Sequence, residues 1–185
     1  MHESAAAEFA ARLKDRLGEV VTGDPRDAKT RVSALIDERS TKRVLEWIES
    51  AVSAGARLVS GGGVDGGVIK PTVLADVPAD AACWNDEIFG PVVCLRAVST
   101  MEEAFDVVND SRYGLNASVF TRSLATAHRA IDTLEVGTVV VNEVPGFRSD
   151  TMPYGGVKDS GIGREGPRFA IEELTVTRMA VIRPA

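Results

Sequence analysis

The sequence predicts an α/β fold with an open, mostly parallel sheet flanked by helices. Apolar, strand-like runs alternate with amphipathic helical segments, and the connections between them are short. That order is typical of parallel strands joined by crossover helices. The chain has 185 residues, 44% of them hydrophobic and 26% charged. This is enough for a domain that buries roughly 70% of its unfolded surface.

The first half of the chain is predicted to hold two helices and two extended segments. The helices are expected at 4–18 and 38–53, and the extended segments at 56–59 and 71–74. Ser4 is the expected N-cap of the first helix and Gly18 its stop. Five glycines within 61–67 predict a mobile loop.

The second half repeats strand and helix, then changes character. Strands are expected at 92–95, 117–120 and 137–141, and helices after Thr100 and at 124–134. The continuous apolar run at 92–95 is typical of a strand covered on both faces. Thr100 and Glu103 have the spacing of a capping box. Residues 142–168 predict a long irregular, functional loop. A projecting strand is expected at 175–182.

The charge balance argues against nucleic acid as a partner. Lysine and arginine number 21 against 27 acidic residues, a net charge of −6, whereas nucleic-acid binders rely on basic surfaces. No apolar run approaches the ~18 residues of a membrane span. The first residues lack the pattern of a secretory signal. These features predict a cytoplasmic protein with no membrane partner.

The cysteines and two glycine motifs are interpreted as structural. Cys83 and Cys94 are too few for a disulfide framework or a four-ligand zinc site, and no neighbouring base or cation activates either thiol. Residues 61–66 and 161–166 match G-x-G-x-x-G, but neither stands between a strand and a helix in a βαβ pattern. Both motifs are predicted to be turns.

Four segments resemble the NAD(P)-dependent aldehyde dehydrogenase superfamily, in the right order from about residue 2 to 182. They are Asn85-Asp-Glu-Ile-Phe-Gly-Pro-Val92, Asn109-Asp-Ser-Arg-Tyr-Gly-Leu115, Gly137-Thr-Val-Val-Val-Asn142 and Met152-Pro-Tyr-Gly-Gly-Val-Lys-Asp-Ser-Gly-Ile-Gly-Arg-Glu-Gly166. The resemblance implies a partial catalytic domain of that family over 1–174. It implies an oligomerisation strand over 175–185.

In the family, a thiolate attacks the aldehyde, a hydride passes to the nicotinamide, and water cleaves the thioester. The family's nucleophilic cysteine, general-base glutamate and cofactor domain precede the segment that resembles 4–18. The resemblance therefore predicts a C-terminal fragment that holds none of the catalytic residues and is inactive alone. NAD or NADP serves the parent enzyme, and neither is expected to bind tightly here.

Two residues are predicted to contact the cofactor. Glu87 matches a family glutamate whose carboxylate accepts hydrogen bonds from the nicotinamide ribose, and two carboxylate oxygens suit a vicinal diol. Phe89 matches an aromatic residue near the nicotinamide ring. The alternatives are a solvated loop residue for Glu87 and a core anchor for Phe89.

Asn142, Phe147 and Arg148 are predicted to bind substrate. Asn142 ends a strand, where open α/β sheets place binding residues. The run 144–150 is similar to that of members that handle phosphonoacetaldehyde and glyceraldehyde-3-phosphate, and an arginine pairs well with such anions. The alternative for Arg148 is a contact with Asp150 or the backbone that only fixes the loop.

Two alternative hypotheses remain open. In one, the chain is a non-enzymatic interaction module; in the other, it is one subunit of a two-chain dehydrogenase. In each case an edge strand at 175–182 predicts self-association into a dimer or tetramer. Lys158 is expected to hold the geometry of its glycine-rich turn.

Overall fold

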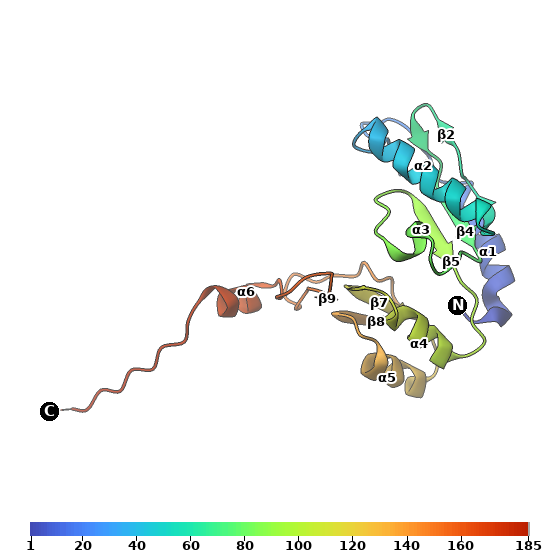
Figure 1. Ribbon diagram of the computed structural model, residues 1–185. Helices are drawn as coiled ribbons and strands as arrows, with labels where there is room; N and C mark the ends of the chain where they lie inside the picture. The colour runs from blue at the N-terminus through green and yellow to red at the C-terminus, as the bar shows by residue number, and fades with distance from the viewer. Residues whose placement is uncertain (185) are drawn as a thin grey trace. The chain divides into compact units, whose positions relative to one another are not determined.

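The computed structural model describes residues 1–184 and divides the chain into two units, Met1–Ala104 and Phe105–Ala185 (Figure 1). The first unit holds α1 (Glu3–Leu17), α2 (Glu38–Ser53), β1 (Arg57–Ser60), β2 (Val64–Asp65), β3 (Val68–Ile69), β4 (Thr72–Ala75), α3 (Ala82–Asn85) and β5 (Val92–Leu95). Helix α4 (Met101–Asn109) runs across the division.

Strand β4 is the centre of the first unit. It pairs antiparallel with β1 and parallel with β5, and all four of its residues are buried. Because successive side chains of a strand point to opposite faces, β4 contributes residues to two hydrophobic core clusters. Leu74 joins a cluster with Ile48 of α2, whereas Val73 and Ala75 join one completed by Leu13 of α1. The α/β class is therefore confirmed.

The predicted helices form, with one change in how the first begins. The N-cap of α1 is His2 rather than Ser4, because the His2 Nδ1 atom accepts a hydrogen bond from the backbone N–H of Ser4 at 3.2 Å. His2 has the extended backbone that an N-cap needs. Gly18 ends the helix as predicted. Asp37 caps α2 through the N–H of Ser40 at 2.6 Å.

The glycine-rich stretch at 61–67 is not simply a loop. Strands β2 and β3 form a two-stranded antiparallel hairpin, and Gly66 and Gly67 make its turn with positive φ angles of 56° and 81°. A two-residue glycine turn matches the twist of paired strands. The prediction of a mobile loop was therefore wrong over 64–67.

Strand β5 is less covered than its apolar sequence predicts. It is the outer strand of the three-stranded sheet, and Val93 is 51% exposed. Leu95 on the same face is buried against the α1 side, and Cys94 packs toward the α2 side. The expectation that both faces are covered was therefore wrong at Val93.

The capping box before α4 forms in a modified way. The backbone N–H of Glu103 donates to Thr100 Oγ1 at 3.1 Å, as predicted. The Glu103 carboxylate accepts from the Ser99 backbone N–H at 2.8 Å, one residue earlier than a capping box requires. The hydrogen bonds that the carboxylate accepts from the Ser99 backbone and side chain lower the pKa of Glu103, since they favour its charged form.

The second unit is built on a βαβ element. It holds β6 (Tyr113–Gly114), β7 (Asn116–Val119), α5 (Leu124–Thr133), β8 (Thr138–Val141), β9 (Val157–Lys158) and α6 (Pro167–Leu174). Strands β7 and β8 pair in parallel, with α5 between them in sequence. The strands and helix predicted here are confirmed to within one residue at most ends.

The region 142–168 contains more structure than its composition predicts. Strand β9 pairs antiparallel with β6, and α6 begins at Pro167. The strand is only two residues long, and its partner lies more than 40 residues earlier, so no local periodicity signals it. The prediction of an entirely irregular segment was wrong at these two points.

The predicted final strand at 175–182 is absent from the chain as described. Residues 175–184 have no regular structure, and Val176, Met179 and Ile182 are at least 85% exposed. A strand needs a neighbour to bond its backbone groups, and this segment has none within residues 1–184. Its pairing with another chain remains a prediction.

Candidate functional site

Glu87 and Phe89 lie in the loop between α3 and β5, and the loop is fixed at its middle. Arg43 of α2 donates from Nη2 to the carbonyl oxygen of Ile88 at 2.8 Å. Gly90 lies against Val44, and a Cβ at this glycine would come within 2.9 Å of a Val44 methyl. The backbone is thus anchored on α2 while the neighbouring side chains remain outside the core.

The side chains of Glu87 and Phe89 are free for a ligand. Phe89 is 70% exposed at a positive φ of 47°, so the alternative that it anchors the core was wrong. Glu87 is exposed, and its carboxylate makes no hydrogen bond or ion pair with any residue in the described range 1–184. An aromatic residue in the left-handed region is uncommon and marks strain that function often explains.

Neither cysteine is prepared to act as a nucleophile. Burial raises the pKa of the Cys94 thiol to about 12, with a further contribution from the nearby Cys83 thiol. Burial also raises the pKa of Cys83. Cys94 Sγ lies 3.4 Å from the carbonyl oxygen of Cys83, so the two residues are neighbours in the core. Both thiols are protonated near neutral pH, and the reactive species is the thiolate.

In the second unit, Asn142 follows β8 directly. Its side-chain Oδ1 accepts from the Thr121 N–H at 2.8 Å, and its Nδ2 donates to the Thr121 carbonyl at 2.9 Å. These two bonds join the ends of β7 and β8 and hold Asn142 at a positive φ of 60°. The amide is thus engaged with the backbone rather than turned free toward a substrate.

Arg148 has two partners that sequence reasoning missed. Its Nη2 donates to Glu165 Oε2 at 2.8 Å, and its Cζ lies 4.6 Å from the centroid of the Tyr154 ring. The contact with Asp150 considered for Arg148 is not made. Phe147 beside it is 52% exposed. No spacing rule links Arg148 to a residue 17 positions later, so no sequence signal was available.

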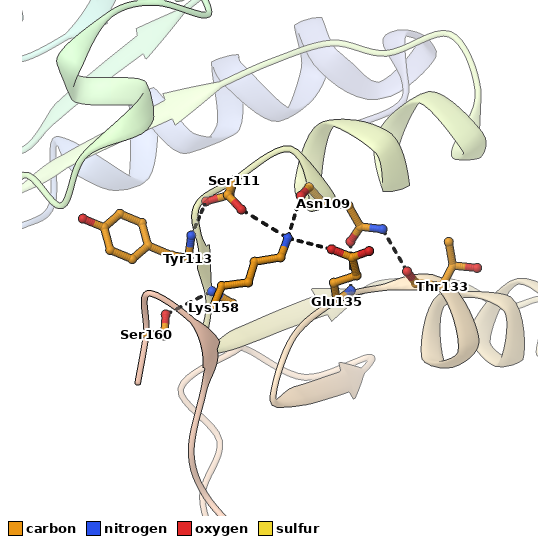
Figure 2. Close-up of polar contacts among 8 residues, drawn as sticks. Asn109, Ser111, Tyr113, Thr133, Glu135, Lys158 and Ser160 are labelled. Atoms are coloured by element: carbon orange, nitrogen blue, oxygen red, sulfur yellow. Dashed lines mark hydrogen bonds and ion pairs between the residues drawn. The ribbon is translucent and has the colours of Figure 1, made fainter. Parts of the chain in front are cut away.

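Lys158 joins three separate segments, as Figure 2 shows. Its Nζ donates to the carbonyl oxygens of Asn109 at 2.6 Å and Ser111 at 3.2 Å, and it lies 2.8 Å from Glu135 Oε2. The Asn109 side chain bonds Thr133 in turn. The ammonium group therefore caps the end of α4 and links it to the segment after α5, which confirms a role in loop geometry.

The glycine motif at 161–166 does not offer a phosphate site. Its Arg164 backbone N–H donates to Glu173 Oε1 at 2.8 Å, and the Glu173 carboxylate lies against Gly163. A carboxylate of α6 thus occupies the place of an anion. The motif forms an irregular stretch in which Glu165 pairs with Tyr154, and its interpretation as a turn stays a prediction. The motif at 61–66 leads into the β2–β3 hairpin, which is a turn.

Residues 1–184 contain neither a candidate membrane-spanning helix nor a candidate metal site. No helix in this range is both long and apolar enough to cross a membrane. No three histidine, cysteine or acidic side chains gather closely enough there to hold a metal ion.

Comparison with known proteins returns enzymes of one class, dehydrogenases that act on aldehydes. Residues 1–180 match the Aldehyde dehydrogenase family, and the chain belongs to that family. The 3-sulfolactaldehyde dehydrogenase of Priestia aryabhattai is 40% identical over 182 residues, which are 98% of this chain and 38% of the relative. The lactaldehyde dehydrogenase of Methanococcus aeolicus is 37% identical over 98% of this chain and 39% of its own length. The chain thus spans about two fifths of these relatives.

Solved structures agree with this assignment. Aldehyde dehydrogenase 21 of Physcomitrella patens, in complex with the reaction product succinate, has a TM-score of 0.90 and 38% identity. Glyceraldehyde-3-phosphate dehydrogenase of Methanocaldococcus jannaschii, complexed with NADP, has a TM-score of 0.88 and 36% identity. Each match covers 93% of this chain, and 36% and 37% of the two solved chains respectively. The fold expected from the resemblance is confirmed.

Proposed function

We propose that this chain forms part of an NAD(P)-dependent enzyme that oxidises a small anionic aldehyde to its acid. Similar proteins include 3-sulfolactaldehyde and sulfoacetaldehyde dehydrogenases. Similar solved structures hold NADP or NAD⁺. The chain spans about two fifths of such relatives, so the activity belongs to an assembly that includes the remaining parts.

The observation that carries this proposal is the free Glu87 carboxylate beside the exposed, strained Phe89. A carboxylate with no protein partner can accept two hydrogen bonds from a ribose diol without giving up an existing contact. The Phe89 ring offers an apolar face that limits where a nicotinamide can lie. When bound, the nicotinamide supplies the acceptor for the hydride.

The nucleophile must come from outside these residues. Acyl transfer needs a thiolate beside a base or a cation, and burial keeps the thiols of Cys83 and Cys94 protonated. The purified chain is therefore expected to produce no reduced nicotinamide from any aldehyde. Steady turnover that disappears on replacing Cys83 or Cys94 would contradict this expectation. Calorimetry should likewise detect no tight binding of NAD or NADP to the chain alone.

Arg148 is the group proposed to bind the anionic end of the substrate. Its guanidinium is held at the surface of the second unit, and its side chain is 46% exposed. Phe147 lies next to it on the same loop and is half-exposed. A planar guanidinium is suited to sulfonate, phosphonate and carboxylate groups because it donates two parallel hydrogen bonds.

A graft tests the proposal. Residues 1–182 would replace the matching segment of the Priestia aryabhattai 3-sulfolactaldehyde dehydrogenase, and formation of reduced nicotinamide would be followed by absorbance. Turnover of 3-sulfolactaldehyde by a folded graft is the expected result. A folded graft without turnover, judged by its circular dichroism and its mass in solution, would refute the proposed function.

Self-association through residues 175–185 is proposed as well. The segment after α6 is extended and exposed (Figure 1), and its apolar residues are interrupted by Arg178 and Arg183. Unpaired backbone groups invite pairing with a second chain. Light scattering should show a dimer or tetramer that becomes monomeric when 175–185 are deleted. An intact chain that is monomeric at high concentration would refute this idea.

A further inference from the structure

We infer that Tyr154 and Glu165 are positioning residues that hold the Arg148 guanidinium ready for the anionic group of an aldehyde substrate. The inference rests on the proposed function, which it deepens by naming the residues that prepare the anion site. The three residues lie between β8 and α6 in sequence, all within the second unit.

The backbone places the two positioning side chains next to each other. The Tyr154 N–H donates to the Glu165 carbonyl at 3.1 Å, and the Glu165 N–H donates to the Tyr154 carbonyl at 2.6 Å. This isolated antiparallel bridge makes the two residues a directly opposed pair. Side chains of such a pair lie on the same face, within reach of a common neighbour.

A glycine follows each member of the pair, Gly155 after Tyr154 and Gly166 after Glu165, and allows the two segments to approach closely enough to form the bridge. A Cβ on Gly155 would collide with the carbonyl oxygen of Gly163. Gly166 has a φ of 114°, and a Cβ there would lie 3.0 Å from the Met152 carbonyl oxygen. Larger residues at either position would push the two segments apart. The sequence therefore fits a close approach at Tyr154 and Glu165.

Arg148 makes one contact with each member of the pair. The Tyr154 ring stacks on its guanidinium at 4.6 Å, and the Glu165 carboxylate takes one Nη2 hydrogen at 2.8 Å. A guanidinium has five N–H donors, and within residues 1–184 the others have no protein acceptor. One edge of the fork therefore stays open to solvent.

This arrangement favours an anionic group over a neutral one. Two oxygens of a sulfonate, phosphate or carboxylate match the two parallel donors of the open edge. The contacts with Tyr154 and Glu165 fix a side chain that otherwise has many rotamers, so less entropy is lost when the anion binds. Glu165 offsets part of the positive charge of Arg148, so the affinity for the anion depends on geometry as well as on charge.

Two substrates differ only in the group that Arg148 would bind. 3-Sulfolactaldehyde carries a sulfonate where lactaldehyde carries a hydrogen, so the ratio of their kcat/KM values in the graft reports on anion recognition. Removing the stacked ring with Tyr154→Leu should lower this ratio about three- to fivefold. Tyr154→Phe keeps the ring and should leave the ratio close to that of the unmodified graft. Arg148→Lys removes the planar fork and should lower the ratio about tenfold or more.

A matched variant controls for general loss of charge pairs. Arg168 and Glu172 form another exposed arginine–glutamate pair, at 3.3 Å on α6, and Arg168→Gln should leave the ratio unchanged. The inference is overturned if Tyr154→Leu and Glu165→Gln leave the ratio as in the unmodified graft, or if Arg168→Gln lowers it equally.

A binding measurement separates failure of the inference from failure of the proposed function. The full 185-residue chain would be titrated with 3-sulfolactate, with lactate as the control, while the NMR signal of Arg148 Nε–H is observed. A saturable shift with 3-sulfolactate alone, lost in Tyr154→Leu, supports the inference even if the graft is inactive. An active graft that prefers 3-sulfolactaldehyde, together with no shift in the chain, would assign recognition to other residues.

Discussion

Phe89 in the first unit and Lys158 in the second share an uncommon backbone, with φ angles of 47° and 53°. Their side chains differ in the contacts they make with the rest of the protein. Lys158 is held by two carbonyl oxygens and the Glu135 carboxylate, whereas Phe89 is 70% exposed. Within the fold, the contacts of Lys158 offset its strain. The strain at Phe89 has no such compensation, so this residue points to a ligand or to another part of the enzyme.

The same contrast separates the residues around them. Glu87, next to Phe89, has no polar partner in the described range 1–184. Asn142 and Arg148 in the second unit are both engaged with protein groups. The first loop therefore leaves its candidate groups without protein partners, while in the second the candidate groups are held by contacts with the protein. Of the four predictions that follow, those on Lys158, Glu87 and Phe89 test this difference.

The largest effect is expected from Lys158→Met. The change leaves two carbonyl oxygens and a carboxylate without their charged donor, and it should lower the free energy of unfolding by about 2 kcal/mol. Denaturation would be followed by tyrosine fluorescence, since both tyrosines lie in the second unit. Lys42→Met removes an exposed ion pair with Glu46 and should cost less than about 0.5 kcal/mol. Equal losses of stability in the two variants would contradict the role of Lys158 in linking the end of α4 to the segment after α5.

The Glu87→Gln variant should weaken binding of the nicotinamide cofactor while leaving the stability of the fold unchanged. The carboxylate makes no protein contact, so the free energy of unfolding should change by less than about 0.5 kcal/mol. In the graft, the KM for the nicotinamide cofactor should rise about tenfold, because a charged acceptor is replaced by a neutral one. An unchanged KM would remove Glu87 from the cofactor site. A large loss of stability would show that it has a structural partner after all.

The raised pKa of the partly buried Cys94 thiol predicts that the free energy of unfolding depends on pH in the alkaline range. Its pKa is raised from 9.0 to about 12 in the folded chain, so the unfolded chain loses this proton first. The free energy of unfolding should therefore fall as pH rises from 9 toward 12, by at most about 1.4 kcal/mol per pH unit. Cys94→Ala should flatten that part of the profile relative to the unmodified chain, as measured by tryptophan fluorescence. Parallel profiles would show that the thiol is not buried.

The smallest effect is expected from Phe89→Gly. Relief of the left-handed backbone should stabilise the fold by about 1 kcal/mol, and the greater freedom of glycine in the unfolded chain cancels roughly half of this gain. A net increase of about 0.5 kcal/mol should appear in urea denaturation. Lys158→Gly relieves the same strain but loses the ammonium contacts, so it should destabilise the chain. If both variants shift stability in the same direction, the contrast between the two regions does not hold.

Local chemistry in the sequence was enough to predict most elements. The apolar spacing of α2 and α5, the glycine after α1 and the strand runs of β7 and β8 depend on neighbouring residues, and these predictions hold. The motifs around Glu87 and Arg148 likewise located the loops of interest and the family. Very short elements were missed, because two-residue strands such as β9 and β2 have no periodicity of their own. The partner of β9 is also distant in sequence.

The sequence by itself determined the α/β class, the family and which loops carry the candidate groups, since each follows from local patterns of side chains. Only the tertiary structure decided what those groups touch. The pairing of Arg148 with Glu165, the three acceptors of Lys158 and the free carboxylate of Glu87 all depend on segments brought together by folding. Hydrogen bonds and ion pairs act over a few ångströms in space, and separation along the chain does not predict that distance.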